Sequence, residues 1–432
     1  MRAAETFTPA LIEALTGAGG LLLAVLTSVA AAVWAVLRLL EDRRSARQEA
    51  AALERRRIEQ RRIDEEGRRA AHVSALMARF GETDDPDIRV WTTLALSLYP
   101  KETARLLAMS LGQFDDDVVA GVKLALLSIG PEALPELVRL NRIAQASRPT
   151  EDAGADAPEP AVYDLGRLLE RTSLLIAAIV MQTDRDALPE LDLEGVDLGG
   201  RCFDRGRLDG LRFRKARLDG AAFRQAGLRR AAFRGASLAE TVFTRAALYE
   251  ADFTGSTGRI AAIKARLDGA RFDHCDLAGS QFDGASLRDV QAEQSDFDRG
   301  SFRGAQLHGA RLARCGLRGV DAGKLKARAL VAEGAKLAKA DVTEASLRDA
   351  RFERCELMGL AARGLRAQGA RFLNCNLGGA DFRGAMLAGA AFRGCQFGGA
   401  DFRGADLAGA ELRGDALDSA QIDPETRTAL GL

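Results

Sequence analysis

Histidine and cysteine are the residues of this chain that could bind a metal or act as nucleophiles, and it contains three and six of them. His72, His274 and His308 lie far apart in the sequence, and Cys275 is the one cysteine that adjoins a histidine. A zinc site needs several such ligands at suitable spacing. A single His-Cys pair does not supply them, so we expect surface histidines and no metal site.

Five cysteines are spaced along the chain by multiples of twenty: Cys275, Cys315, Cys355, Cys375 and Cys395. In a structure that repeats at this interval they form one column, with Ser295 and Ala335 between them. Such a column could be a redox or metal ladder. Cysteine is also a small buried hydrophobe, and dry burial raises the thiol pKa and makes the thiol inert. We expect this second role, which suits a reducing cytosol.

Sequence motifs for catalysis are missing from the chain. It has no nucleophile elbow, no phosphate-binding loop of the Walker type and no paired metal-ligand motif. We therefore expect no catalytic residue, no cofactor and no enzyme activity. An enzyme or ligand-binding module would need its site in the helical region or at residues 254–265, described below.

A five-residue repeat dominates the chain from about residue 191 to 424. Leu or Phe recurs every five residues, as at Phe203, Leu208 and Phe213, with small residues two places earlier and often Gly two places later. A period of five gives no stripe on a helix and puts successive residues on opposite faces of a flat strand. The pattern closes when four units form one square circuit, with Leu or Phe pointing inward and circuits stacked about 4.8 Å apart.

The repeats "ADFRG" and "ADLAG" near the C-terminus match the consensus A(D/N)LXX. The chain thereby resembles the pentapeptide-repeat family over residues 191–424. That resemblance implies a right-handed quadrilateral β-helix. With the N-terminal segments added, we expect a mixed, mainly β fold in which a transmembrane helix and an all-α HEAT-like domain precede this solenoid.

The register of the repeat slips once. Inward residues up to Phe253 keep one phase, and those from Leu267 onward come one residue early. We expect a bulge or a short loop that leaves the square at residues 254–265. Alanines stand at four inward positions and predict under-packed sides: Ala322, Ala332, Ala362 and Ala367. Pro424 predicts the end of the solenoid, followed by a tail at 425–432.

The N-terminal part contains a long uncharged stretch from Ala14 to Leu37. A helix of this length can cross a bilayer, so we expect a short N-terminus at 1–13 and a transmembrane helix at 14–40. Arginines follow this stretch, which puts the N-terminus outside and the remainder in the cytoplasm. We expect a single-pass inner-membrane protein. A small-residue seam could pair two such helices: Gly20, Ala24, Ser28 and Ala32.

Residues 41–80 predict a charged continuation of that helix. Two segments within 81–190 align with each other at a constant offset, end at Pro100 and Pro131, and are each followed by a second apolar segment. This pattern predicts HEAT-like helical hairpins. Between them and an apolar core helix at 161–182, the segment 147–161 is rich in Pro, Ala and acidic residues and predicts a flexible loop.

The charge of the repeat region limits its partners. Residues 191–432 contain 38 Lys and Arg against 32 Asp and Glu. A rod with this excess of basic residues is a poor mimic of a polyanion, and its aromatic residues face inward where bases cannot stack. We therefore expect a membrane-anchored, non-enzymatic scaffold for unknown protein partners, which does not bind nucleic acid. The alternative is a DNA-mimicking protein that binds and protects a topoisomerase.

Overall fold

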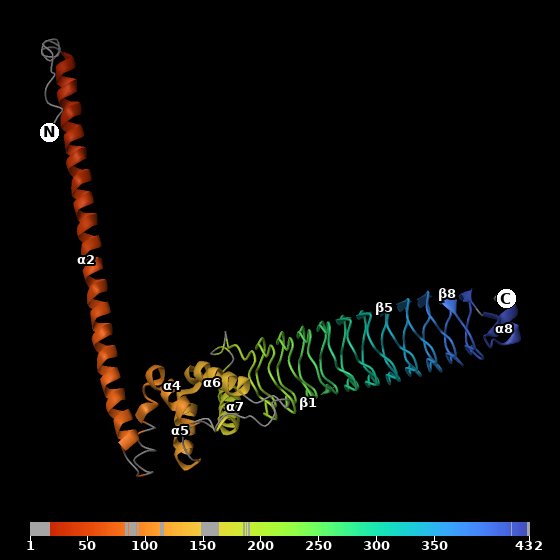
Figure 1. The fold of residues 1–432 in the computed structure, drawn as a ribbon. Helices are drawn as coiled ribbons and strands as arrows, with labels where there is room; N and C mark the ends of the chain where they lie inside the picture. Colours follow the sequence, from red (N-terminus) through yellow and green to blue (C-terminus); the bar gives the residue numbers. More distant parts are fainter. Residues whose placement is uncertain are drawn as a thin grey trace. The chain divides into compact units, whose positions relative to one another are not determined.

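The computed structural model describes residues 18–82, 85, 92, 95–112, 116–147, 164–184, 186, 188, 191–415 and 417–429. They form a long helix, a helical region and a β-solenoid, in that order along the chain (Figure 1). The chain divides into two compact units at Ala75 and Leu76.

Helix α2 extends over Ala18–Glu82. Its charged half carries ion pairs between residues four apart, as between Arg62 and Glu66 and between Glu65 and Arg69, each at 3.0 Å. Such pairs support an exposed helix. The predicted helix at 41–80 is therefore part of one longer helix, Ala18–Glu82.

Within the described residues, no helix combines the length and the apolar character that crossing a bilayer requires. Residues 1–13 and the first four residues of the predicted span at 14–40 lie outside the described residues. The remainder of that span belongs to α2, as does the predicted seam of Gly20, Ala24, Ser28 and Ala32. The anchor, its orientation and pairing through this seam stay predictions from the sequence.

The helical region contains α4 (Pro100–Ser110), α5 (Asp116–Ile129), the 3₁₀ turn η1 (Gly130–Ala133), α6 (Leu134–Ala146) and α7 (Leu165–Gln182). Pro100 begins α4 and Pro131 lies in the first turn of η1, where proline's missing N–H costs nothing. Helix α7 is buried over much of its length, as a core helix should be. The HEAT-like relationship stays a prediction, and residues 148–161 of the predicted loop lie outside the described residues.

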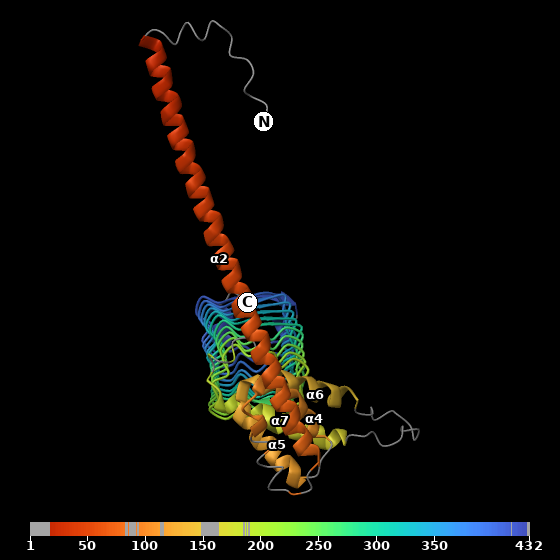
Figure 2. The same ribbon diagram turned by 90° about the vertical axis from the view of Figure 1, so that its left-hand side faces the viewer.

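The solenoid follows, and its circuits are joined by parallel backbone bridges between residues 20 apart, such as Cys202 and Ala222. Viewed along the solenoid, four sides enclose its interior (Figure 2). Strands β1 (Thr241–Val242) and β2 (Ile260–Ala261) pair in parallel. A parallel seven-stranded sheet runs in chain order along one side: β3 (Gln291–Glu293), β4 (Arg311–Ala313), β5 (Val331–Glu333), β6 (Arg351–Glu353), β7 (Arg371–Leu373), β8 (Ala391–Gln396) and β9 (Glu411–Asp415).

Phenylalanine rings form two columns inside the solenoid. Phe203 and Phe223 stack in one column at 4.9 Å between ring centroids, and Phe213 and Phe233 stack in the other at 5.2 Å. Rings from the two columns meet edge to face, as Phe203 and Phe213 do at 6.4 Å. Offset-stacked and edge-to-face pairs are the arrangements that aromatic rings prefer. The alternation of Phe and Leu over residues 203–253 therefore places Phe on two opposite sides and Leu on the other two, whereas Phe297 and Phe397 later occupy a third side.

The register break has a different cause from the one predicted. Ser237 still pairs with Thr257 at an offset of 20, but Thr241 pairs with Ile260 at an offset of 19. The circuit is thus one residue short, and no bulge or loop leaves the wall. Gly258 makes the shortened corner with a φ of +109°. The prediction of a loop at 254–265 was wrong. A short deletion and a longer insertion can give the same shift in the five-residue phase, so the repeat alone does not distinguish them.

The N-terminal end of the solenoid is covered by helix α6. Asn141 is fully buried. Its Oδ1 accepts the backbone N–H of Asp197 at 2.8 Å, and its Nδ2 donates to the Asp197 carbonyl at 3.2 Å. Arg142 donates to the carbonyls of Glu194 and Asp192. These side chains occupy hydrogen-bonding positions that a preceding circuit would otherwise fill, so they cap the stack.

The C-terminal end closes with the 3₁₀ turn η3 (Leu417–Ser419) and helix α8 (Pro424–Ala429). The backbone N–H of Gly404 donates to the carboxylate of Asp423 at 2.7 Å, just before α8 begins. Pro424 therefore marks the end of the repeats, as expected. Most of the predicted tail at 425–432 is helical, and residues 430–432 lie outside the described residues.

The shortened corner predicts a sharp requirement for glycine. A Cβ at position 258 would lie 2.4 Å from the backbone nitrogen of Ala239. We expect Gly258→Ala to lower the free energy of unfolding by about 3 kcal/mol, because a backbone clash adds to an unfavourable φ. At the ordinary corner of Gly235 the nearest atom is a lysine Cγ at 3.5 Å, so Gly235→Ala should cost only about 1 kcal/mol. Equal unfolding midpoints in denaturant for the two variants would contradict this account.

The N-terminal cap predicts an unequal response to two substitutions on α6. Asn141→Ala should lower stability by about 2–3 kcal/mol, because it removes buried hydrogen bonds to the Asp197 backbone. Arg139→Ala, which removes an exposed ion pair with Glu136, should cost less than about 1 kcal/mol. Hydrogen exchange at the amide of Asp197 and its neighbours is the measurement. Unchanged protection in Asn141→Ala would show that α6 does not cap the stack.

Candidate interaction surface of the solenoid

The three histidines are not brought together. His72 is exposed on α2, and His274 stands at an exposed corner, while its neighbour Cys275 is buried. His308 lies on the wall of the solenoid, partly exposed. Among the described residues, no group of three or more His, Cys, Asp or Glu side chains could hold a metal ion. Among the described residues, the histidines and cysteines therefore do not form a shared site.

The five predicted cysteines form one buried column, as expected. Each thiol lies within hydrogen-bonding distance of a carbonyl one circuit earlier, as Cys275 Sγ does with Phe253 O at 3.0 Å and Cys395 Sγ does with Phe372 O at 3.3 Å. Ser295 makes the same contact with the carbonyl of Phe272. The column therefore supplies hydrogen-bond donors to inward-facing carbonyls. This role was missed in the sequence, although the alternation of Cys and Ser at one position was its signal.

Four of the five thiols of the column have a raised pKa and are held in their protonated form, whereas the hydrogen bond with Cys375 lowers the pKa of Cys355. Burial raises the pKa of Cys275, and it raises the pKa of Cys315 to about 11. The hydrogen bond with Cys355, together with burial, raises the pKa of Cys375 to about 12. A protonated thiol is a poor nucleophile and metal ligand. Cys202, the sixth cysteine, faces outward on another side of the solenoid.

The aspartates that follow an inward residue are engaged by the backbone. Asp204 Oδ1 accepts the N–H of Arg224 at 2.7 Å, one circuit later, and Asp298 Oδ1 accepts the N–H of Arg318 at 2.7 Å. The same contact recurs along the solenoid, at Asp209, Asp219, Asp268 and Asp283. These carboxylates are therefore held against the wall. In the pair of Arg318 and Asp298 the arginine side chain is 48% exposed and the aspartate 22%, so arginine is the group that projects.

One side of the solenoid carries a compensated ladder of charges. Arg363 pairs with Asp381 at 2.6 Å, Arg383 lies between Asp381 and Asp401, and Arg403 pairs with Asp401 at 2.7 Å. Such exposed pairs add little to stability. Their effect is to fix the positions of charged groups along a straight wall at the spacing of the circuits.

A polar cleft of about 360 Å³ lies where α7 meets the first circuits. Its lining includes Glu170, Ser173 and Arg201, together with Arg217, which bridges Asp197 at 2.9 Å and Asp219 at 3.1 Å. An enzyme or ligand-binding site in the described part of the helical region could use this cleft. Arg217 is already paired with the carboxylates of Asp197 and Asp219, so these charged groups stabilise the junction between α7 and the first circuits.

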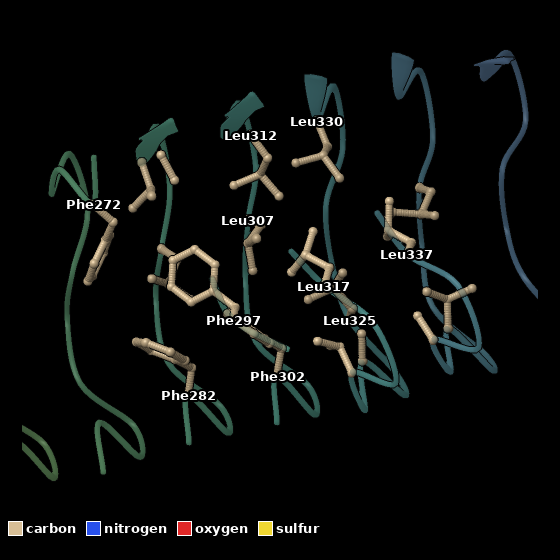
Figure 3. Close-up of a pocket in the computed structure, with 18 of the residues that line it drawn as sticks. Phe272, Phe282, Phe297, Phe302, Leu307, Leu312, Leu317, Leu325, Leu330 and Leu337 are labelled. Atoms are coloured by element: carbon tan, nitrogen blue, oxygen red, sulfur yellow. The ribbon is translucent and has the colours of Figure 1, made fainter. Parts of the chain in front are cut away.

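An enclosed apolar cavity of about 60 Å³ lies inside the solenoid (Figure 3). It lies where the phenylalanine columns are interrupted, between Phe302 and Phe352. Leucine and alanine fill the inward positions there, and Ala322 lines the cavity while Ala332 is buried beside it. The predicted under-packing is thus confirmed at Ala322, whereas Ala332, Ala362 and Ala367 do not line the cavity. The cavity is closed by the walls and lined by apolar side chains, so it offers no polar group to a ligand.

Family models identify the repeats. A model described as a pentapeptide repeat region matches residues 345–422, and one described as pentapeptide repeats of eight copies matches residues 228–257, 265–304 and 285–321. The resemblance seen in the sequence is therefore supported by these models and by the β-helical fold. A search of curated proteins found no match.

Several solved structures resemble the solenoid. QnrB1, a plasmid-mediated fluoroquinolone resistance protein, is 18% identical with a TM-score of 0.33, and the match covers 54% of this chain and 95% of QnrB1. HetL, a pentapeptide repeat protein involved in heterocyst differentiation regulation from the cyanobacterium Nostoc sp. strain PCC 7120, is 22% identical with a TM-score of 0.19, covering 52% and 87%. At these values the likenesses carry no argument about function.

The cavity predicts that a slightly larger residue stabilises the solenoid. Ala322→Val adds two methyl groups to the cavity wall, and we expect it to raise the free energy of unfolding by about 1 kcal/mol. Ala362 occupies the same inward column outside the cavity, so Ala362→Val should instead lower stability by about 1 kcal/mol through overpacking. Denaturant unfolding of both variants is the measurement. A loss of stability in Ala322→Val would show that the cavity cannot accept the added volume.

Proposed function

We propose that this chain, whose C-terminal part is a solenoid of pentapeptide repeats, is a non-enzymatic scaffold that binds partner proteins on the outer sides of the solenoid. The observation that carries the proposal is the fixed register of the outward side chains. Every outward position recurs one circuit later on the same side, so charged groups stand in straight columns on a closed, packed interior. Preorganised columns of this kind reduce the ordering cost of binding.

The hydrogen bonds made by the buried thiols and by the aspartates support a binding role over a catalytic one. The buried thiols and the aspartates that follow inward residues donate to or accept from the backbone. These groups build the wall, whereas a catalytic nucleophile or base must be available to a substrate. The groups left to meet a partner are the outward arginines and lysines and the ion pairs between circuits.

The topoisomerase alternative requires a rod that imitates DNA. The solenoid carries more basic than acidic residues, and many of its aspartates are held by backbone N–H groups. Both features oppose mimicry of a polyanion. The membrane anchor at residues 14–40, with the N-terminus outside and the bulk of the chain in the cytoplasm, remains part of the proposal on the strength of the uncharged stretch and of the arginines that follow it.

Proximity labelling in intact cells tests the proposal. A labelling enzyme is fused to the C-terminus of the full chain and of a chain that lacks residues 1–40, and the labelled proteins are purified and titrated against the full chain. We expect a defined set of proteins that bind saturably and depend on outward side chains of the solenoid. Labelling of membrane-proximal proteins by the full chain alone supports the anchor as well.

Three outcomes would overturn the proposal. A copurifying small molecule that the chain converts to product, or a copurifying metal that supports such a conversion, would favour an enzyme. Protection of DNA supercoiling from a quinolone-type poison by the purified chain would favour the topoisomerase alternative. Absence of any labelled protein that binds the purified chain would leave the scaffold role without support.

A further inference from the structure

Basic side chains occupy successive circuits on one side of the solenoid. We call this set the basic strip, and its members are Arg288, His308, Lys326, Arg328, Arg348 and Arg366. The backbone shows that they stand in register. Asp289 N donates to the His308 carbonyl at 2.9 Å, Gly309 N to that of Arg328 at 3.0 Å, and Ala329 N to that of Arg348 at 2.9 Å.

Most side chains of the basic strip have no ion-pair partner among the described residues. Arg328 pairs with Asp349 at 3.1 Å, and this is the strip's one ion pair among the residues that the structure describes. Arg288 and Arg348 donate instead to the neutral side-chain oxygens of Gln306 and Gln368. Lys326 and Arg366 are exposed. The strip therefore differs from the side of the solenoid where arginines and aspartates alternate.

The environment of His308 shows the effect of the positive charges of the basic strip. Its Nδ1 accepts the backbone N–H of Arg328 at 3.1 Å, where other circuits place an aspartate. Partial burial lowers the pKa of His308, and the charges of Arg288, Lys326 and Arg328 lower it further. The imidazole is therefore neutral at physiological pH, and its neighbours repel any additional positive charge.

We propose that the basic strip binds an extended acidic segment of a partner protein. The inference rests on the scaffold role proposed above and specifies the chemistry of the partner. Arginine's planar fork matches a carboxylate in two-point contact. The strip extends over four circuit spacings, or about 19 Å, which is the length of about six residues of extended peptide.

The shape of the strip favours a peptide over other polyanions. It is one or two side chains wide, and the exposed carboxylates of Asp289 and Asp349 border it at one corner of the wall. A flat anionic bilayer or a DNA duplex would contact that corner as well and meet these carboxylates. The strip also has no aromatic side chain on which the bases of a single strand could stack. A narrow acidic chain avoids both problems.

Binding of the full chain to a fluorescein-labelled peptide of alternating Glu and Ser, followed by fluorescence anisotropy, tests the proposal. The test variant is Arg348→Glu with Arg366→Glu. The matched control is Arg311→Glu with Arg371→Glu, which changes the charge equally at exposed positions on another side of the solenoid. We expect the test variant to weaken binding by about tenfold or more, the control to weaken it by less than about threefold, and added salt to weaken it in all cases.

Titrations with three further ligands identify the class of partner. A peptide of alternating Gln and Ser, a DNA duplex and phosphatidylcholine vesicles that contain phosphatidylserine are titrated in the same way. Equal weakening by test and control variants, or tighter strip-dependent binding of duplex or vesicles than of the acidic peptide, overturns the inference. Proteins captured through outward residues other than the strip would overturn this inference and leave the scaffold role standing, whereas no captured protein would remove both.

Discussion

The hydrogen bond between one circuit's backbone and the next is the constraint on which the solenoid depends. Each inward residue donates its N–H to a carbonyl one circuit later, as Phe203 does to Ala222 at 2.6 Å. A circuit built from four complete repeats keeps this match on all four sides. The one circuit that is a residue shorter keeps it only because Gly258 turns the corner with a backbone that other residues rarely adopt. Backbone pairing between circuits therefore requires the five-residue repeat length. The repeat length in turn sets which side chains face inward.

A stack of paired circuits leaves unpaired backbone groups at each end, and parallel strands with open edges invite further pairing. The chain meets this problem with different elements. Helix α6 supplies Asn141 and Arg142 to the backbone of the first circuit, and the turn before α8 supplies Asp423 to one of the last. The helical region thus has a structural role at the solenoid, whatever else it binds.

The need for backbone hydrogen bonds also accounts for the positions of the described thiols, hydroxyls and aspartates of the wall. A buried thiol or hydroxyl at the small inward position donates to a backbone carbonyl one circuit earlier. An aspartate on the wall meets a backbone N–H that needs an acceptor. Basic side chains have no such use in the wall, since they cannot accept a hydrogen bond. They remain outside, and the places where acidic residues do not balance them become the charged features of the surface.

Periodicity alone determined the square solenoid, the inward Phe and Leu, the buried cysteine column and the end of the repeats near Pro424, because a period of five is incompatible with a helix or a flat strand. It also indicated the under-packing at Ala322. Tertiary structure decided the remainder. Whether a phase change is a loop or a shortened corner depends on which backbone groups meet across circuits, and the bonds of Asn141 and Cys275 join residues 56 and 22 apart. The basic strip likewise exists only because equivalent positions in successive circuits become neighbours.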